Sequence, residues 1–258
     1  MMFTTKVLEN KEITASLYYL KLQVPDKFNA MPGQFVMLKI NDSFDPILRR
    51  PFSISGFSKN RIEILYKVIG KGTKLISHKK VGDEVNIIGP LGNNFNIDNS
   101  KIPVLIAGGY GVAPLLFLAK NIRKYSKNKK IVFLFGAKSK KDIMLRKEFK
   151  KYAITLNVAT EIGGTGYKGL ITDLLKYLLD NKTLLPEKIK IYACGPEKMI
   201  KEISKIASQT NISCEVSLEA LMGCGIGVCL TCVCATKFGL YKHICIDGPI
   251  FDSTIIKL

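Results

Sequence analysis

IPVLIAGGYGVAPLLFLA, residues 102–119, is the stretch of sequence that decides the fold. Its first part, Ile102–Ala107, is an apolar run with the length of a buried strand, and its last part belongs to the helical pattern of Val112–Lys124. The two parts are separated by three glycines, Gly108, Gly109 and Gly111. Glycine can adopt backbone dihedral angles that are sterically forbidden for other residues. The stretch therefore predicts a strand, a tight turn and a helix, which is the first unit of a parallel α/β sheet.

The same stretch has to be tested as a membrane span, because its 18 residues carry no charge. A spanning helix needs about 20 uninterrupted apolar residues. Pro114 and the three glycines interrupt this one, so we predict no membrane segment and no membrane partner. The first ten residues, MMFTTKVLEN, have no apolar core of a secretory signal, so we expect a cytoplasmic protein.

Downstream, apolar runs continue to alternate with helical patterns. The expected strands and helices are Ile131–Phe135, Lys141–Lys151, Ile154–Ala159, Ile171–Leu179 and Ile189–Ala193. This alternation predicts a doubly wound parallel α/β domain over residues 100–210. Cys194-Gly195-Pro196 follows the last strand, at the edge where such sheets bind ligands.

Upstream, residues 1–99 have a different rhythm. Short runs rich in Val, Ile, Tyr and Phe are separated by Gly, Pro and Asn: Leu17–Val24, Gln34–Ile40, Arg61–Ile69 and Glu84–Ile88. Many short strands with turn signals between them predict an antiparallel β-barrel.

The remaining residues, 211–258, are too few for a core of their own, since segments below about 50 residues usually need a metal, disulfides or a docking surface. They contain the spacing Cys224-x4-Cys229-x2-Cys232, followed by Cys245. This is the spacing of plant-type [2Fe–2S] sites. A zinc site or simply buried thiols are the alternatives.

Other residues near the cysteine motif have expected places too. Glycines on either side of Cys224 would let the loop bring three thiolates to one side of a cluster. Cys234 is expected to pack beside the site, and Cys194 and Cys214 to be buried in strands.

The formal net charge is +18, from 39 Lys and Arg against 21 Asp and Glu. A basic chain invites a nucleic-acid interpretation. The lysines are scattered over most elements, however, and no zinc finger, RNP motif or basic helix accompanies them. We therefore predict no nucleic-acid partner.

Two motifs in the barrel half suit a flavin nucleotide. In RRPFSI, residues 49–54, an arginine can pair with a pyrophosphate, a proline or aromatic ring can cover an isoalloxazine, and the Ser53 hydroxyl can bind flavin N5. GKGT, residues 70–73, opens a helix expected over Thr73–Ser77, whose free N–H groups would face a phosphate.

Taken in order, the motifs resemble those of the ferredoxin–NADP reductase-like flavoproteins. They are R-P-F-S at 50–53, G-x-G-T at 70–73, G-P-L-G at 89–92, G-G-x-G-V-A-P at 108–114 and C-G-P at 194–196. SLEALMGCGIGVC, residues 217–229, and CIDGPIF, residues 245–251, are similar to one branch, the electron-transfer subunits of type B NAD-dependent dihydroorotate dehydrogenases.

The resemblance implies a FAD domain over 1–99, an NAD domain over 100–210 and a [2Fe–2S] segment over 211–258. The implied FAD contacts are Arg50, Pro51, Phe52, Ser53, Leu65, Tyr66, Lys67, Gly72 and Thr73. The implied NAD contacts are Gly108, Gly109, Gly111, Cys194, Gly195 and Pro196, and the implied cluster ligands are Cys224, Cys229, Cys232 and Cys245. Tyr110 departs from the family pattern, which commonly has a small residue there.

The resemblance also implies a division of labour. In such complexes an FMN-containing partner oxidises dihydroorotate to orotate, in pyrimidine biosynthesis, and electrons cross the cluster to FAD and then NAD. A heterotetramer of two plus two subunits is the implied assembly. No residue of this chain is expected to be catalytic, and both histidines, His78 and His243, are expected to be surface or structural residues.

Two further functions are kept open. The chain could be the diaphorase subunit of another redox complex, such as a sulfhydrogenase, a sulfite reductase or a ferredoxin–NADP oxidoreductase. It could also be a non-catalytic iron–sulfur sensor. Stoichiometric FAD and NADH-dependent dye reduction by the purified protein would exclude the sensor.

Overall fold

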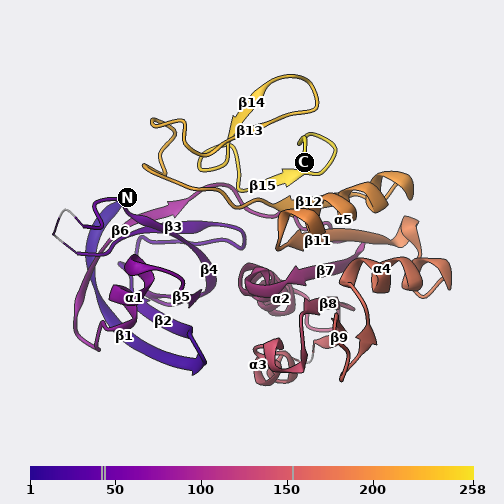
Figure 1. The fold of residues 1–258 in the computed structure, drawn as a ribbon, viewed down its shortest axis with the longest axis horizontal. Coiled ribbons are helices and arrows are strands. Elements are labelled where there is room, and N and C mark those ends of the chain that lie inside the picture. The colour runs from indigo at the N-terminus through magenta and orange to yellow at the C-terminus, as the bar shows by residue number, and fades with distance from the viewer. Residues whose placement is uncertain (42, 44, 153) are drawn as a thin grey trace.

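The computed structural model describes residues 1–41, 43, 45–152 and 154–258. It has an antiparallel barrel, a parallel sheet covered by helices, and a C-terminal segment that lies across both (Figure 1). The expected fold class is confirmed.

The barrel closes in the strand order β1-β2-β5-β4-β3-β6. Its strands are β1 (Met2–Thr14), β2 (Leu17–Gln23), β3 (Phe35–Lys39), β4 (Arg50–Ser58), β5 (Arg61–Lys67) and β6 (Glu84–Leu91). Alternating apolar side chains fill the interior, among them Leu20, Ile54 and Ile64, all at most 1% exposed. Helix α1 (Lys71–Ser77) follows β5 and begins two residues before its predicted start.

The second sheet has the strand order β10-β9-β8-β7-β11-β12-β15, parallel except for β15. Its strands are β7 (Ile102–Gly108), β8 (Val132–Ala137), β9 (Thr155–Thr160), β10 (Tyr167–Lys168), β11 (Ile189–Cys194), β12 (Cys214–Ser217) and β15 (Ile250–Asp252). Helices α2 (Val112–Tyr125) and α3 (Arg146–Lys151) pack on one face, and α4 (Ile171–Asp180) and α5 (Glu197–Gln209) on the other. This is the doubly wound arrangement.

Helix α2 also joins the two domains. Phe117 on α2 is 5% exposed and belongs to the core of the barrel, whereas Leu115 and Leu118 belong to the core of the sheet. Lys120, on the same helix, pairs with Glu63 of β5 at 3.4 Å. The barrel and the sheet are therefore packed on opposite sides of one helix.

The helix expected over Lys141–Lys151 is wrong in extent. Lys140–Asp142 forms a 3-10 turn, because the Asp142 carboxylate accepts hydrogen bonds from the backbone and hydroxyl of Ser139 at 2.9 and 2.7 Å. Leu145 then has a positive φ of 58°, so the α-helix begins only at Arg146.

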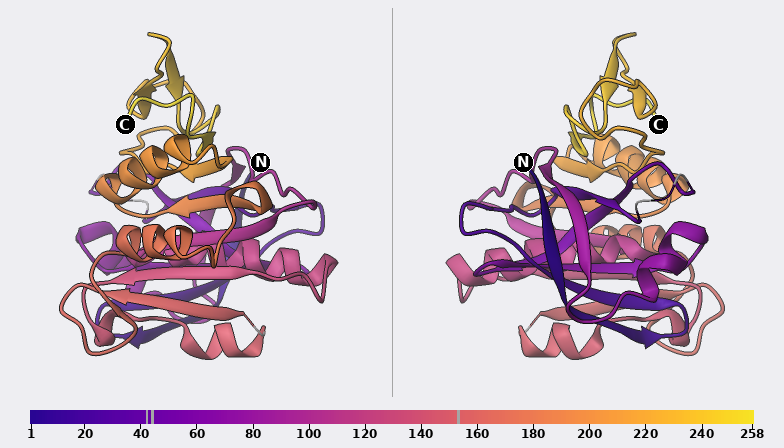
Figure 2. Two further views of the ribbon diagram at one scale, coloured as in Figure 1. Left: turned by 90° about the vertical axis from the view of Figure 1, so that its right-hand side faces the viewer. Right: turned by 90° about the vertical axis from the view of Figure 1, so that its left-hand side faces the viewer.

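The C-terminal segment has no separate core. Strands β12 and β15 extend the parallel sheet, and only the hairpin β13 (Val233–Ala235) and β14 (Tyr241–His243) stands apart, as the yellow cap in Figure 2 shows. Cys232, Ile244 and Cys245 share one buried cluster with Phe35 and Met37 of the barrel. The described part of the chain has no helix long and apolar enough to cross a membrane.

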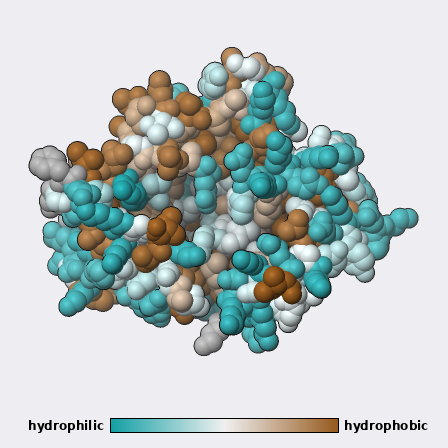
Figure 3. Space-filling view, in the orientation of Figure 1, coloured by the Kyte–Doolittle hydropathy of each residue, from teal (hydrophilic) through white to brown (hydrophobic). Residues whose placement is uncertain are grey.

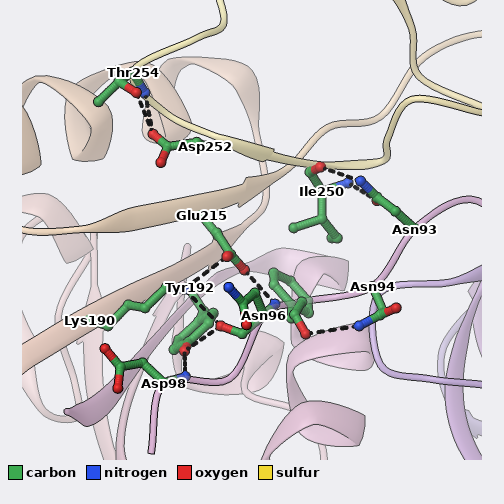
Figure 4. Close-up of polar contacts among 11 residues, drawn as sticks. Asn93, Asn94, Asn96, Asp98, Lys190, Tyr192, Glu215, Ile250, Asp252 and Thr254 are labelled. Atoms are coloured by element: carbon green, nitrogen blue, oxygen red, sulfur yellow. Dashed lines mark hydrogen bonds and ion pairs between the residues drawn. The ribbon is translucent and has the colours of Figure 1, made fainter. Parts of the chain in front are cut away.

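A set of polar contacts, here called the linker clamp, ties the segment between β6 and β7 to the sheet (Figure 4). The Lys190 ammonium lies 2.8 Å from the Glu215 carboxylate and 2.7 Å from the carbonyl oxygen of Asn96, whose N–H donates to Glu215 at 2.9 Å. The Asn93 side chain makes three further hydrogen bonds, to Asp247 and Ile250 of the C-terminal segment. The clamp therefore holds all three parts of the chain together.

Candidate functional site

The four predicted cluster ligands lie in two neighbouring pairs. The backbone N–H of Cys229 donates to the Cys224 sulfur at 3.4 Å, and burial together with the neighbouring Cys232 thiol raises the pKa of Cys245 to about 12. Within the described residues, no three Cys, His, Asp or Glu side chains surround one point, as a single metal ion would require. Two pairs of thiols fit a two-iron cluster, in which each iron takes two thiolates, better than a zinc site.

Hydrogen-bond donors surround these sulfurs. The Cys224 sulfur accepts N–H groups of Ile226 and Cys229 at 3.4 Å each, and the Cys245 sulfur accepts the N–H of Gly227 at 3.2 Å. The Thr231 hydroxyl donates to Cys229 at 3.1 Å and lowers the pKa of that exposed thiol to about 6. Such donors stabilise the thiolate form that binds iron.

The loop of Cys224 and Cys229 is pressed against the barrel. Gly225 has a φ of 74°, and a methyl group there would lie 2.6 Å from Cγ of Met37 on β3. Gly227 has a φ of 82°, and a methyl group there would lie equally close to the Ile246 side chain. The backbone thus requires both glycines, and the close approach of loop and barrel requires Gly225 as well.

The other cysteines lie where they were expected. Cys194 and Cys214 are buried in β11 and β12, and burial raises the pKa of each thiol to about 12. Cys234 is half-buried in β13, next to the ligand loop. His78 ends α1, and His243 lies in β14, where Asp247 accepts its backbone N–H at 2.7 Å.

The two flavin motifs meet in space. Arg50, at the start of β4, lies against Gly72 at the start of α1, where a methyl group would be 3.1 Å from the arginine Nε. The Thr73 hydroxyl accepts the N–H groups of Ile69 and Gly70 at 3.0 and 3.2 Å and holds this turn. Arg49 points elsewhere and donates to the Asn86 carbonyl at 3.1 Å.

Not every predicted flavin contact can present its side chain. Phe52 and Tyr66 lie inside the barrel, edge to face with ring centroids 5.8 Å apart, and Leu65 is 8% exposed. Their backbone alone can face a ligand. Pro51 and Ser53 are half-buried on the outer side of β4. Lys67 is exposed, with its ammonium 5.5 Å from the Tyr110 ring of the neighbouring domain.

The two nucleotide turns also meet. A methyl group at Gly111 would lie 2.1 Å from the carbonyl oxygen of Cys194, and one at Gly108 would lie 2.7 Å from Cδ of Pro196. Gly195 has a φ of 155° and is packed against Gly108. The glycines therefore allow the ends of β7 and β11 to touch at the carboxyl edge of the sheet.

A cavity of about 890 Å³ opens beside these turns. Gly108, Gly109 and Pro196 line it, whereas Gly111, Cys194 and Gly195 form the layer behind. Barrel residues line one end, including Lys67. The volume is within the range of about 300–1,000 Å³ found for small-molecule sites.

Sequence reasoning missed the other end of the cavity. It is lined by residues that follow β8 and β9 or begin α4, including Lys138, Met144, Glu161 and Leu170. Their positions after strand ends were the available signal, because ligands of parallel sheets bind at that edge.

Three features define the class of this protein. They are a barrel in which an arginine lies against a glycine turn, a parallel sheet with a cavity at its carboxyl edge, and paired cysteines on the barrel rim. Together they define an iron–sulfur flavoprotein reductase of the ferredoxin–NADP reductase type. Comparisons with known proteins agree. Residues 4–95 match the oxidoreductase FAD-binding domain, 105–205 the oxidoreductase NAD-binding domain, and 219–257 the iron–sulfur cluster binding domain of dihydroorotate dehydrogenase B.

The chain belongs to the electron transfer subunits of NAD-dependent dihydroorotate dehydrogenase B. It is 38% identical to that subunit of Desulforamulus reducens, and the match covers 97% of this chain and 96% of the relative. It is 40% identical to that subunit of Clostridium acetobutylicum, and the match covers 95% of this chain and 93% of the relative. It is thus an oxidoreductase subunit with FAD, NAD and iron–sulfur domains.

Solved structures agree with the fold. The structure of an NADH-dependent reduced ferredoxin–NADP oxidoreductase superposes with a TM-score of 0.85 at 28% identity, covering 98% of this chain and 89% of that one. A ferredoxin–NADP⁺ reductase from Neisseria gonorrhoeae shares the fold, with a TM-score of 0.69 at 18% identity. The superposition covers 81% of this chain and 91% of that one.

Proposed function

We propose that this chain accepts electrons from an FMN-containing catalytic subunit that oxidises dihydroorotate, in a cytoplasmic assembly of two copies of each subunit, and delivers them to NAD⁺. When bound, the [2Fe–2S] cluster supplies one-electron transfer and FAD supplies conversion between single electrons and a hydride. The observation that carries the proposal is the contact of Gly225 with Met37, which joins the cysteine loop to the barrel.

The cysteine loop has the residues that this role needs. Cys224, Cys229, Cys232 and Cys245 would hold the two irons, and the N–H groups of residues 226, 227 and 229 would stabilise the sulfurs. The seven cysteines all lie within the described residues and none of them is in a disulfide, which suits the reducing conditions of the cytoplasm.

The barrel residues would hold FAD. The Arg50 guanidinium would pair with the pyrophosphate beside the turn of Gly72 and Thr73, and Pro51 and Ser53 would face the isoalloxazine. Phe52, Leu65 and Tyr66 would contribute backbone groups. Lys67 lies where the barrel meets the cavity.

The cavity would receive NAD(H). The turn of Gly108 and Gly109 lets a pyrophosphate approach the backbone, and α2 directs its positive end there. Lys67 and Tyr110 at the barrel end would border the nicotinamide, so the hydride donor and acceptor would meet between the domains.

The surface around the cysteine loop supports a partner subunit. Leu221, Ile226, Val228 and Leu230 are 84%, 52%, 74% and 59% exposed, and they flank the ligand cysteines. Figure 3 shows apolar side chains gathered over this upper part of the molecule. An exposed apolar patch of this kind marks a protein interface.

Replacing Cys229 by Ser tests the proposed electron path, with Cys234 replaced by Ser as the matched control. Reconstituted with the FMN subunit, Cys229→Ser should lose dihydroorotate-dependent NAD⁺ reduction but retain NADH oxidation by artificial dyes. Cys234→Ser should retain both reactions and its iron content.

Both activities are measured on one preparation, after FAD content and circular dichroism confirm the fold. Coupled turnover at the wild-type rate without iron would contradict the path through the cysteine loop. Failure of any dihydroorotate-dependent turnover in the wild-type complex would favour another redox partner instead.

A further inference from the structure

Asn10 on β1 holds the end of helix α1 with its side-chain amide. The Nδ2 group donates to the carbonyl oxygens of Ile76 and Lys79, each at 2.9 Å, and the Oδ1 atom accepts the Tyr66 hydroxyl at 3.0 Å. A side-chain amide has two N–H donors and a carbonyl acceptor, and Asn10 uses both kinds of group here. This half-buried side chain thereby joins β1, β5 and the C-terminal end of α1.

Helix α1 depends on contacts of this kind for its position. It has seven residues, of which Gly72 and Ile76 are buried. An isolated helix of this length is not stable in water, and its last carbonyl groups have no partners within the helix. The two hydrogen bonds from Asn10 therefore fix where the helix ends.

The start of the same helix lies against Arg50. A methyl group at Gly72 would be 3.1 Å from the arginine Nε, and the Arg50 guanidinium also donates to the Leu48 carbonyl at 2.6 Å. Gly72 and Ile76 are separated by little more than one helical turn, about 6 Å along the axis. A shift of the helix at Ile76 therefore also changes the contact between Gly72 and Arg50.

We propose that Asn10 is a positioning residue for FAD. By holding the C-terminal end of α1, it keeps the turn of Gly70–Thr73 against Arg50, so that the guanidinium is already in place when the pyrophosphate binds. Asn10 acts through the helix and the arginine and needs no contact with the cofactor. The inference rests on the proposed contact of Arg50 with FAD.

A role of Asn10 in barrel stability alone predicts a different result, and Asn86 on β6 provides the comparison. Its amide is also half-buried, and it donates to the Thr4 hydroxyl of β1 at 3.0 Å. This hydrogen bond joins two strands of the barrel and does not involve α1. Loss of either amide should weaken the barrel, but only loss of the Asn10 amide should change the FAD site.

The test measures the dissociation constant of FAD from the full-length, FAD-loaded chain, as fluorescence of the flavin released on dilution. Asn10→Asp keeps the size of the side chain and the acceptor for Tyr66, but it places a carboxylate against two carbonyl oxygens. FAD should therefore bind roughly tenfold more weakly. Asn86→Asp makes the same chemical change and should bind FAD as wild type does.

Two further measurements separate positioning from a loss of stability. The ³¹P chemical shifts of the bound pyrophosphate should move in Asn10→Asp and stay as in wild type in Asn86→Asp. In an Arg50→Ala background, Asn10→Asp should weaken FAD by less than about twofold further, because the group through which it acts is gone. A structural role alone would add its whole effect in both backgrounds.

Wild-type FAD affinity or unchanged ³¹P shifts in Asn10→Asp would overturn the inference. So would a loss in the Arg50→Ala background as large as in the wild-type background. If Asn10→Asp does not fold, Asn10→Ser, which keeps one donor and one acceptor, is measured in the same way. If Arg50→Ala alone bound FAD as wild type does, the proposed FAD contact would fail, and the inference with it.

Discussion

At the scale of single residues, the two arginines of RRPFSI have different tasks. Arg50 faces the glycine turn, so its loss should raise the dissociation constant of FAD at least roughly tenfold, because a bidentate charged contact to phosphate disappears. Arg49→Ala is the matched control: it removes the hydrogen bond to Asn86 and should leave FAD affinity near wild type. Lys67→Ala should also affect FAD less than Arg50→Ala.

The measurement is the fluorescence of FAD released on dilution, with thermal unfolding recorded for each variant. Equal FAD affinity in wild type and Arg50→Ala would contradict the assignment of the pyrophosphate to this arginine.

The Cys229 thiol should show a distinct pH dependence once the cluster is removed with a chelator. Its pKa is lowered to about 6 because the Thr231 hydroxyl donates to the sulfur, whereas burial raises that of Cys245 to about 12. A lowered pKa means that the thiolate is present above pH 6, so Cys229 should be alkylated at half its maximal rate near that pH and Cys245 hardly at all.

Mass spectrometry of each cysteine after a timed iodoacetamide pulse measures these rates. Thr231→Val should move the Cys229 midpoint to higher pH. Uniform alkylation of all four ligand cysteines would show that the loop does not keep its structure without iron.

Individual residues also show what a motif can predict. Spacing predicts the four cysteines as cluster ligands, because a short loop must supply three thiolates. It could not show that Phe52 and Tyr66 turn inward, because which face of a strand is buried depends on barrel closure. Nor could it find Glu161, whose neighbours in the cavity come from β8 and α4.

At the scale of elements, the loop between Gly223 and Cys229 tests how packing supports the cysteines. Gly225→Ala should lower iron content and stability, because its φ of 74° is strained for alanine and its methyl group would meet Met37 at 2.6 Å. Gly239→Ala is the matched control, since its φ of 78° is similar but no atom lies within 4 Å. It should lower the free energy of unfolding by about 1–2 kcal/mol and retain the cluster.

Iron per FAD and the visible absorption of the cluster compare the two variants. A Gly225→Ala protein with full iron content would show that the loop can leave the barrel without losing the cluster.

Elements with strong local patterns were predictable, and those that depend on partners were not. The apolar run of β7 and the spacing in α4 gave both elements nearly to their ends. Helix α5 was missed although Ile200, Ile203 and Ala207 recur at helical spacing. Strands β12 and β15 were missed as parts of the parallel sheet, because four- and three-residue strands exist only through their neighbours.

At the scale of the whole molecule, the linker clamp should contribute strongly to stability. The side chains of Lys190 and Glu215 are only 7% and 13% exposed. Lys190→Met therefore leaves the Glu215 carboxylate buried without its cation, and it should lower the free energy of unfolding by about 3–5 kcal/mol. Lys176→Met removes the ion pair with Glu202, which has a similar length but side chains that are 47% and 35% exposed. It should lower the free energy of unfolding by less than about 1 kcal/mol.

Urea unfolding followed by circular dichroism and FAD fluorescence measures both variants. Adding Glu215→Gln to Lys190→Met should recover part of the loss, since it removes the unpaired charge. Equal costs for the two lysine variants would mean that the clamp is no more than a surface contact.

The use of β12 and β15 in the second sheet has a consequence for where this chain can be divided. The predicted boundary at residue 211 separates the cysteines from β11, but a chain divided there would leave β11 as an open sheet edge with unpaired backbone groups. A graft of the iron–sulfur segment therefore has to bring β12 and β15 with it if the edge of β11 is to stay covered.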